Sequence, residues 1–124
     1  MTMTVSNATM LSDLSKALQS LHQHLLQFQA RESGFTGTPL QLFKRATSDS
    51  AFAWLKPLRV VIVSLDERRA DDAPLTRAEV GTLRAHVRGV LDGALGAKLP
   101  AAFQAQPEAV VAVGAVRKSL AALD

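Results

Sequence analysis

The feature that most constrains the fold is a set of apolar residues near the N-terminus that repeats at alternating steps of three and four. Its members are Leu11, Leu14, Leu18, Leu21, Leu25 and Phe28. On an α-helix this spacing places all of these side chains on one narrow stripe. The sequence therefore predicts a long amphipathic helix, with Thr9 or Ser12 as its N-cap and Gly34 as a left-handed exit.

The most apolar stretch, FAWLKPLRVVIVSLDE at residues 52–67, supports two interpretations. The β-branched run from Val60 to Val63 has high strand propensity. Leu58, Val61, Ile62 and Leu65, however, fall at the spacing of a helical face. The only other β-branched cluster, AVVAVGAV, would give an isolated two-stranded sheet, which is marginally stable. We therefore predict a helix that Pro57 either kinks or begins, and that neighbouring helices nearly surround.

Capping signals predict three further helices. Thr38-Pro39 is typical of a helix start, and a short helix to about Ala46 would bury its apolar side chains, namely Leu40, Phe43 and in one alternative Leu42. Thr76-Arg77-Ala78-Glu79 forms a capping box, and Pro107-Glu108 opens the last helix, which has almost no polar face. Between these two, KLPAAFQAQ reads as a linker with one helical turn.

These elements predict an all-α fold, a bundle of four to five helices with a Pro-interrupted central helix. We expect the third and the last long helices to be its most buried elements. Residues 1–9 are polar and aperiodic and are expected to be a flexible tail, followed by a single domain over residues 10–124. A chain of 124 residues that is 48% hydrophobic suits one globular core.

The composition limits which cellular location and which binding partners are expected. The first ten residues have no basic residue and no apolar run of signal-peptide length, and no segment reaches about 18 uninterrupted apolar residues. We therefore expect a cytoplasmic protein without a membrane segment. The chain has no cysteine and a net charge of +3, which is too small to predict nucleic-acid binding by itself.

No motif in the sequence points to catalysis. The two histidines His22 and His24 are two residues apart, so a helix would direct them to different sides and they would not share a metal. No serine lies in a Gly-x-Ser-x-Gly elbow, and no Walker-type loop appears. We therefore expect no catalytic, cofactor-binding or metal-binding residue, while an enzyme built from positions distant in sequence stays an open alternative.

Two sets of side chains are candidates for a partner surface. The aromatic set, expected to line an apolar groove or to belong to the core, is Phe43, Phe52 and Trp54. The cationic set, expected along one side of the helix that follows the capping box, is Arg77, Arg84 and Arg88. With Lys44 and Arg45 these arginines could contact phosphates, or their stems could cover the bundle edge. Few aromatic residues are available to stack bases, so nucleic acid is the less favoured partner.

Small residues form a second face on the same helix, at positions Ala78, Thr82, Ala85, Gly89, Gly93 and Gly96. They are either inexpensive surface positions or a seam where another backbone comes close. The last helix also lacks a polar side before Arg117, so a second subunit would cover it well. Because symmetric dimers are the commonest oligomers, we expect a homodimer.

Four segments, LHQHLLQFQ, TPLQLFK, FAWLKPLRVVIVSLDE and AAFQAQPEAVVAVGAV, together resemble a group of small, uncharacterised bacterial proteins, mainly proteobacterial. The similarity covers most of the chain from Leu21 onward. It implies an all-helical cytoplasmic domain and carries no activity to any residue. The function expected is a non-catalytic helical interaction or oligomerisation module, with an unknown protein partner possible; the alternative is a nucleic-acid-associated or small-ligand-binding regulator.

Overall fold

The structure is a computed structural model that describes residues 7–71 and 73–123. Within these residues the chain forms helices and no strands, so the all-α prediction is confirmed. The elements in chain order are α1 (Asn7–Glu32), α2 (Pro39–Ser48), the 3₁₀ helix η1 (Ser50–Leu55), α3 (Lys56–Arg69), α4 (Arg77–Gly89), the π-helical segment η2 (Val90–Ala94), α5 (Leu99–Ala105) and α6 (Glu108–Ala122).

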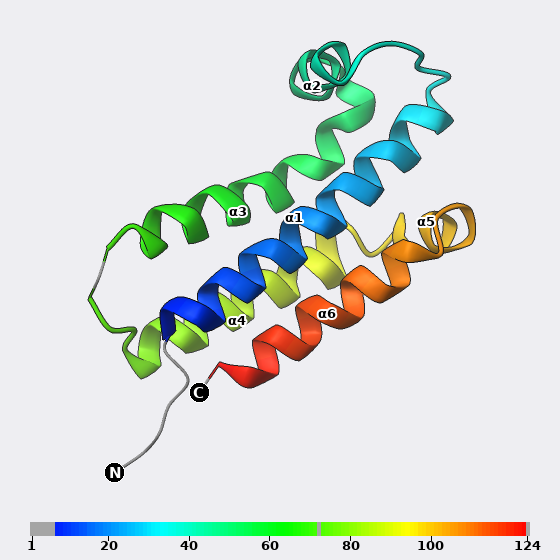
Figure 1. Cartoon of the computed structure of the whole chain (residues 1–124). Coiled ribbons are helices and arrows are strands. Elements are labelled where there is room, and N and C mark those ends of the chain that lie inside the picture. The colour runs from blue at the N-terminus through cyan, green and yellow to red at the C-terminus, as the bar shows by residue number, and fades with distance from the viewer. Residues whose placement is uncertain (1–6, 72, 124) are drawn as a thin grey trace.

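The four long helices run up and down along one axis, and the short helices α2 and α5 lie at one end (Figure 1). Successive long helices in the order α1, α3, α4 and α6 are antiparallel, as in an up-and-down bundle (Figure 1). None of the helices that the structure describes is both long enough and apolar enough to cross a bilayer.

The core is centred on α1, which packs most extensively against α6 and next against α3. The leucine stripe of α1 is buried as predicted, but polar positions of this helix are buried as well. Ser15 donates a hydrogen bond to Asp66 of α3 (2.8 Å), and Gln29 accepts one from Trp54 of η1 (2.7 Å). The prediction that the third and last long helices are the most buried is wrong, because α1 packs against α6, α3, η1 and α5 and is the most enclosed helix. These hydrogen bonds satisfy its buried polar side chains.

The sequence predicted the end of α1 but not its start. The helix begins at Asn7, so Thr9 and Ser12 lie inside it and the prediction that one of them is its N-cap is wrong. Residues 7–9, expected in the flexible tail, are helical, and the rest of that tail lies outside the described residues. Beyond Glu32 the chain reverses at Gly34, which has a φ of +66°. The Gly34 N–H donates to Arg31 (3.0 Å) and the Phe35 N–H to Ala30 (2.8 Å). These bonds confirm the left-handed exit, a conformation that glycine adopts without steric penalty.

Helix α2 starts as predicted, but its apolar side chains are more exposed than predicted. Thr38 and Gln41 form a capping box, with Pro39 at the first helical position. Only Ala46 is buried, while Leu40 is exposed and Phe43 is 61% exposed, so the predicted burial of these two is wrong. The reason is position: α2 lies at the end of the bundle and contacts chiefly η1 (Figure 1).

The stretch with two interpretations is helical, and its proline lies at the second position of α3. Pro57 therefore begins this helix and does not interrupt a central one. Asp49 caps η1 by accepting a hydrogen bond from the Ala51 N–H (2.9 Å). Helix α3 is an outer helix with Val60 and Val63 exposed, so the prediction that neighbours nearly surround it is wrong.

The second half of the chain also follows its capping signals. The Thr76–Glu79 capping box starts α4 as predicted, and α6 starts at Glu108, with Pro107 as the residue that precedes it. The expected linker contains α5, a full short helix. A Cβ atom added at Gly89 or Gly93 would meet nothing within 4 Å, so no other backbone of the described chain forms a seam there.

Candidate functional site

The three aromatic candidates do not form one groove. Phe52 is fully buried in the core, which is one of the two alternatives for this set, whereas Phe43 is exposed on α2. Trp54 is half-buried with its ring edge-on to Phe28, at 6.4 Å between centroids and an 80° interplanar angle. Its indole N–H donates to Gln29, and the Lys98 ammonium lies 5.9 Å from its ring centroid. Trp54 thus joins η1 to α1 as a packing residue.

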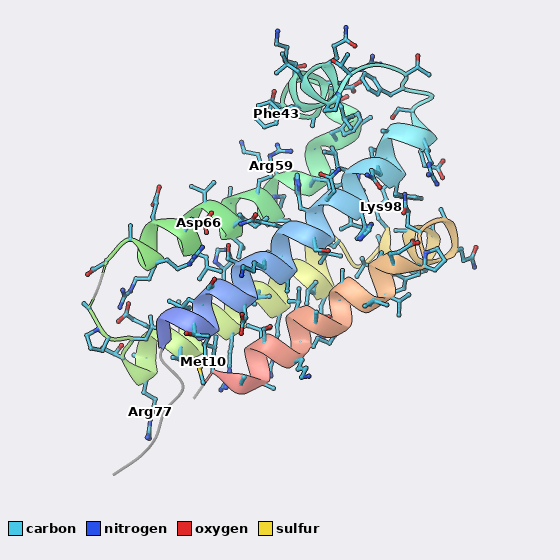
Figure 2. All side chains as sticks on the ribbon, viewed as in Figure 1. Met10, Phe43, Arg59, Asp66, Arg77 and Lys98 are labelled. Atoms are coloured by element: carbon cyan, nitrogen blue, oxygen red, sulfur yellow. The ribbon has the colours of Figure 1, made fainter. Side chains whose placement is uncertain are left out.

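The cationic candidates lie in two separate places. Arg77 lies at the start of α4, at the opposite end of the bundle from α2, which carries Lys44 and Arg45 (Figure 2). Arg84 donates to the carbonyl of Leu120 (3.0 Å) in the last turn of α6, where a cation complements the helix dipole. Arg88 is exposed on the last turn of α4. The five cations therefore do not form one surface for a nucleic acid.

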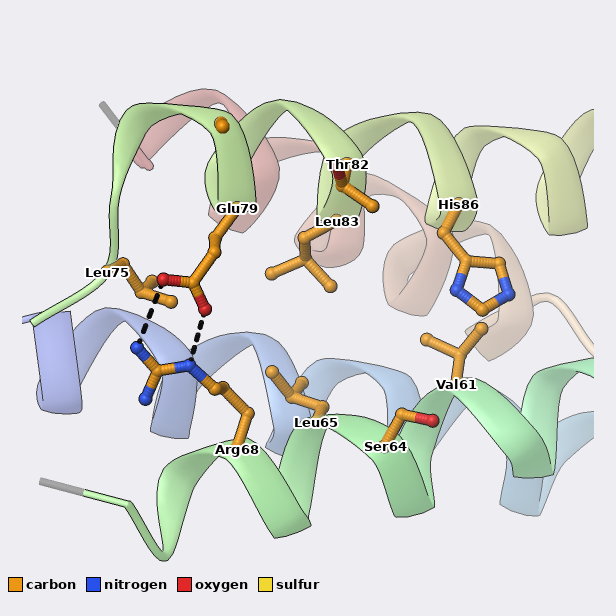
Figure 3. A pocket seen from close by; sticks show the side chains of 10 residues that line it. Val61, Ser64, Leu65, Arg68, Leu75, Glu79, Thr82, Leu83 and His86 are labelled. Carbon is orange, nitrogen blue, oxygen red and sulfur yellow. Dashed lines mark hydrogen bonds and ion pairs between the residues drawn. The ribbon is translucent and has the colours of Figure 1, made fainter. Parts of the chain in front are cut away.

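A cleft of about 340 Å³ lies between α3 and α4, two helices that contact each other only sparsely (Figure 3). Its floor is apolar and its rim carries the hydroxyls of Ser64 and Thr82. The lining residues are Val61, Ser64, Leu65, Arg68, Leu75, Ala78, Glu79, Thr82, Leu83 and His86. A concave apolar surface with a few polar groups at its edges is the usual form of a binding site.

An ion pair between Arg68 and Glu79 closes one end of the cleft (Figure 3). The Arg68 Nε donates to one carboxylate oxygen at 2.7 Å, and a second guanidinium nitrogen approaches the other oxygen at 3.4 Å. The hydrogen bond from Arg68, followed by that from the Thr76 N–H, lowers the pKa of Glu79 to about 2. Glu79 is therefore ionised at neutral pH, and the pair presents no unbalanced charge to the cleft.

Arg68 also organises the connection between the two helices. Its guanidinium donates to the backbone carbonyls of Asp71 (3.3 Å), Ala73 (3.0 Å) and Pro74 (3.2 Å). From its position on α3, this one side chain therefore bonds both the connection and the first turn of α4. This network fixes the separation of α3 and α4 at the closed end of the cleft, since Glu79 is itself part of the capping box.

The other end of the cleft is marked by His86, an exposed residue on the last turns of α4 (Figure 3). Between the ion pair and this histidine the side chains of Val61, Leu65 and Leu83 point into the space that separates the helices (Figure 3). The arrangement can hold an apolar group along the floor and offer hydrogen bonds at its edges.

The remaining histidines lie on α1, and His22 lies where this helix meets α3, beside Arg59 and Ile62. Burial, and then the charge of Arg59, lower the pKa of His22 to about 4, so its imidazole is neutral at pH 7. The buried nitrogens His22 Nε2 and His24 Nδ1 have no hydrogen-bond partner among the described residues. No group of three or more histidines or carboxylates in the described part of the chain could hold a metal ion.

Sequence reasoning did not find the α3–α4 cleft. Val61 and Leu65 were predicted as members of an apolar helical face, and such a face alone does not show whether the neighbouring helix is close or distant. The available signal was the pair of opposite charges, Arg68 and Glu79, on either side of one short connection. Comparisons of the chain with protein-family models, curated proteins and solved structures found no match.

Proposed function

We propose that the protein is a non-catalytic helical interaction module that receives an amphipathic helix of a partner protein in the α3–α4 cleft. The observation that carries this proposal is the sparse contact between two antiparallel helices over an apolar floor. Most helix pairs in a bundle close such a space with their own side chains. A space left open along two helices matches the groove-binding mode of amphipathic helices.

The side chains of the cleft favour a helix as the occupant. Val61 and Leu65, one helical turn apart on α3, form the base of the cleft and are only 1% and 2% exposed. The half-buried Leu75 and Leu83 supply more of the apolar surface that a partner can reach (Figure 3). Apolar residues of a partner at i, i+3 or i+4 and i+7 would lie along this floor. Because Glu79 already neutralises Arg68, the floor requires no charged group from the partner. The hydroxyl groups of Ser64 and Thr82 on the rim can form hydrogen bonds with polar side chains of the incoming helix.

A small apolar ligand is the second candidate for the same cleft. The volume of about 340 Å³ falls at the lower end of the roughly 300–1,000 Å³ of small-molecule pockets. A ligand of this kind would make the protein a small-ligand-binding regulator. We propose a cytoplasmic location for both versions, and cell fractionation tests it directly.

The test uses two exposed positions of α4 that differ in their relation to the cleft. Thr82 lines the rim, whereas Ala85, three residues later, does not line it. A photo-crosslinking amino acid at position 82 should capture a protein segment with apolar residues at helical spacing. The same group at position 85 should capture it much less.

The captured partner is then purified and titrated against Thr82→Arg and the matched control Ala85→Arg. Thr82→Arg should weaken binding by about tenfold or more, while Ala85→Arg should leave it within about twofold. Circular dichroism checks that both variants fold. Equal capture at both positions, or unchanged affinity for Thr82→Arg, would contradict the helix proposal. Native mass spectrometry that finds a bound small molecule would support the second candidate instead.

A further inference from the structure

The outer face of α6 is apolar although nothing in the described chain covers it. The inner face of this helix packs on α1 and α5 through buried residues such as Ala109 and Val116. On the outer side Val110 is half-exposed and Val111 is 74% exposed. A helix of a monomer usually carries polar residues on the side that faces water. The outer face of α6 therefore has the composition of a contact surface.

Charges mark the two ends of this face in a symmetric pattern. Glu108, Val111, Ala115 and Lys118 follow one another at steps of three, four and three residues, so they share one stripe of the helix. Read in either direction, the stripe is charge, apolar, apolar, charge, and the two charges are opposite. Both Glu108 and Lys118 are exposed, and neither has an ion-pair partner among the described residues.

We propose that two copies of this chain pair through the outer faces of α6 in an antiparallel, two-fold symmetric arrangement. A two-fold axis beside residue 113 brings Glu108 of one copy opposite Lys118 of the other, at both ends of the contact. The same axis places Val111 opposite the second copy's Ala115. A two-fold symmetric contact requires this self-complementarity, because if residue i of one copy contacts residue j of the other, then residue j of the first copy contacts residue i of the second.

The alternative direction conflicts with the charges. A parallel pair would place Glu108 opposite Glu108 and Lys118 opposite Lys118, which is unfavourable at both ends. Gly114 leaves room for a second copy in either direction, since it has no side chain and a Cβ at this position would meet nothing within 4 Å. This proposal does not involve the α3–α4 cleft and stands or falls separately from it.

The width of the contact predicts its strength. The surface consists of one helix of 15 residues, so it is small beside the roughly 800 Å² per partner of a standard interface. The dimer is therefore expected to dissociate on dilution and to weaken as salt is added. Sedimentation velocity over a range of protein concentrations measures both properties on the full chain.

Charge variants test the register. In sedimentation at low salt, Glu108→Lys and Lys118→Glu should each weaken self-association by about tenfold or more, because each places like charges together at both ends. An equimolar mixture of these two variants should associate again, since every contact then joins opposite charges. The double variant Glu108→Lys/Lys118→Glu should also recover. Glu67→Lys, on the exposed surface of α3, serves as the control and should associate as the unchanged chain does.

Crosslinking tests the same register without changing any charge. The chain contains no cysteine, so introduced thiols report only on their own positions. An oxidised mixture of Val111→Cys and Ala115→Cys should form a covalent heterodimer faster than either variant forms a homodimer. A monomer at all concentrations, single charge variants that associate normally, or fastest crosslinking of Val111→Cys with itself would each overturn the proposal.

Discussion

The helix pairs α1–α6 and α3–α4 belong to one bundle but meet in different ways. α1 and α6 have the most extensive contact of any pair, whereas α3 and α4 have little contact and leave a cleft of about 340 Å³. α6 turns short side chains toward the core, among them Ala109, Ala112 and Val113, which allow a close approach. At one end of the cleft the long side chains of Arg68 and Glu79 span the space and join α3 to α4. Short side chains thus accompany the close helix pair, and a long ion pair accompanies the open one.

The largest expected effect contrasts a leucine on the closed side with one on the open side. Leu21 of α1 is fully buried, while Leu83 of α4 is half-buried at the cleft. Leu21→Ala should lower the free energy of unfolding by about 2–5 kcal/mol, because it leaves a cavity in the core. Leu83→Ala should lower it by less than half as much. Urea denaturation measures both, and equal losses would mean that the α3–α4 side is as closed as the α1–α6 side.

The seam between α1 and α3 is predicted to be sensitive to acid. The pKa of His22 is lowered from 6.5 to about 4, so the unfolded chain binds a proton at higher pH than the folded chain does. The contribution is therefore complete above about pH 6.5 and is lost as the pH falls toward 4. The loss should be on the order of 2–3 kcal/mol.

Urea midpoints measured at several pH values in this range test the assignment to His22. His22→Gln should flatten the pH dependence of the midpoint. Gln23→Asn changes a neighbouring side chain of the same seam without removing a titrating group, so it should retain the dependence. If His22→Gln and Gln23→Asn behaved alike, the acid sensitivity would have to come from another group.

Two substitutions of Glu79, at the closed end of the cleft, are expected to lower the thermal midpoint by different amounts. Glu79→Gln removes the ion pair with Arg68 but keeps an amide for the capping box, as Gln41 does in α2. Glu79→Ala removes both, so it should lower the thermal midpoint further. The pKa of Glu79 is lowered to about 2, so in the unchanged chain this contribution is present above about pH 4.5 and lost toward pH 2. Equal midpoints for the two variants would show that the cap does not depend on this side chain.

The smallest expected effect concerns the small-residue face of α4. Gly89 has helical backbone angles, and a Cβ there would meet nothing within 4 Å. Gly89→Ala should therefore raise the free energy of unfolding by about 0.5–1 kcal/mol. Gly96→Ala should lower it, because its Cβ would collide with the carbonyl oxygen of Asp92. A loss of stability with Gly89→Ala would indicate that this face packs closely against a second chain.

The sequence predicted the features that depend on a few neighbouring residues. The Thr38 and Thr76 caps each involve a partner three residues away, and the exit at Gly34 involves one turn of α1. Such contacts form in the local backbone geometry whatever the rest of the chain does. The helical state of residues 56–69 was predictable for a related reason, since its apolar period outweighed the strand propensity of its valines.

The sequence could not predict how the helices are placed beside one another. An apolar stripe shows which side of a helix is buried but not which helix covers it, so the central position of α1 and the exposure of Phe43 were missed. The cleft was missed for the same reason, because its width depends on Arg68 and Glu79, which are 11 residues apart. Arg84 was a candidate for phosphate contact, yet its bond reaches Leu120, 36 residues away.

The hydrogen bonds from Arg68 to the carbonyls of Asp71, Ala73 and Pro74 limit the length of the connection between α3 and α4. The Arg68 side chain can contact these oxygens and Glu79 at the same time only if the connection keeps its present length. An inserted residue would carry those oxygens out of its reach and release α4 from α3. The reversal after α1 relies on the backbone of Gly34 instead, so added residues beyond Phe35 should be tolerated there.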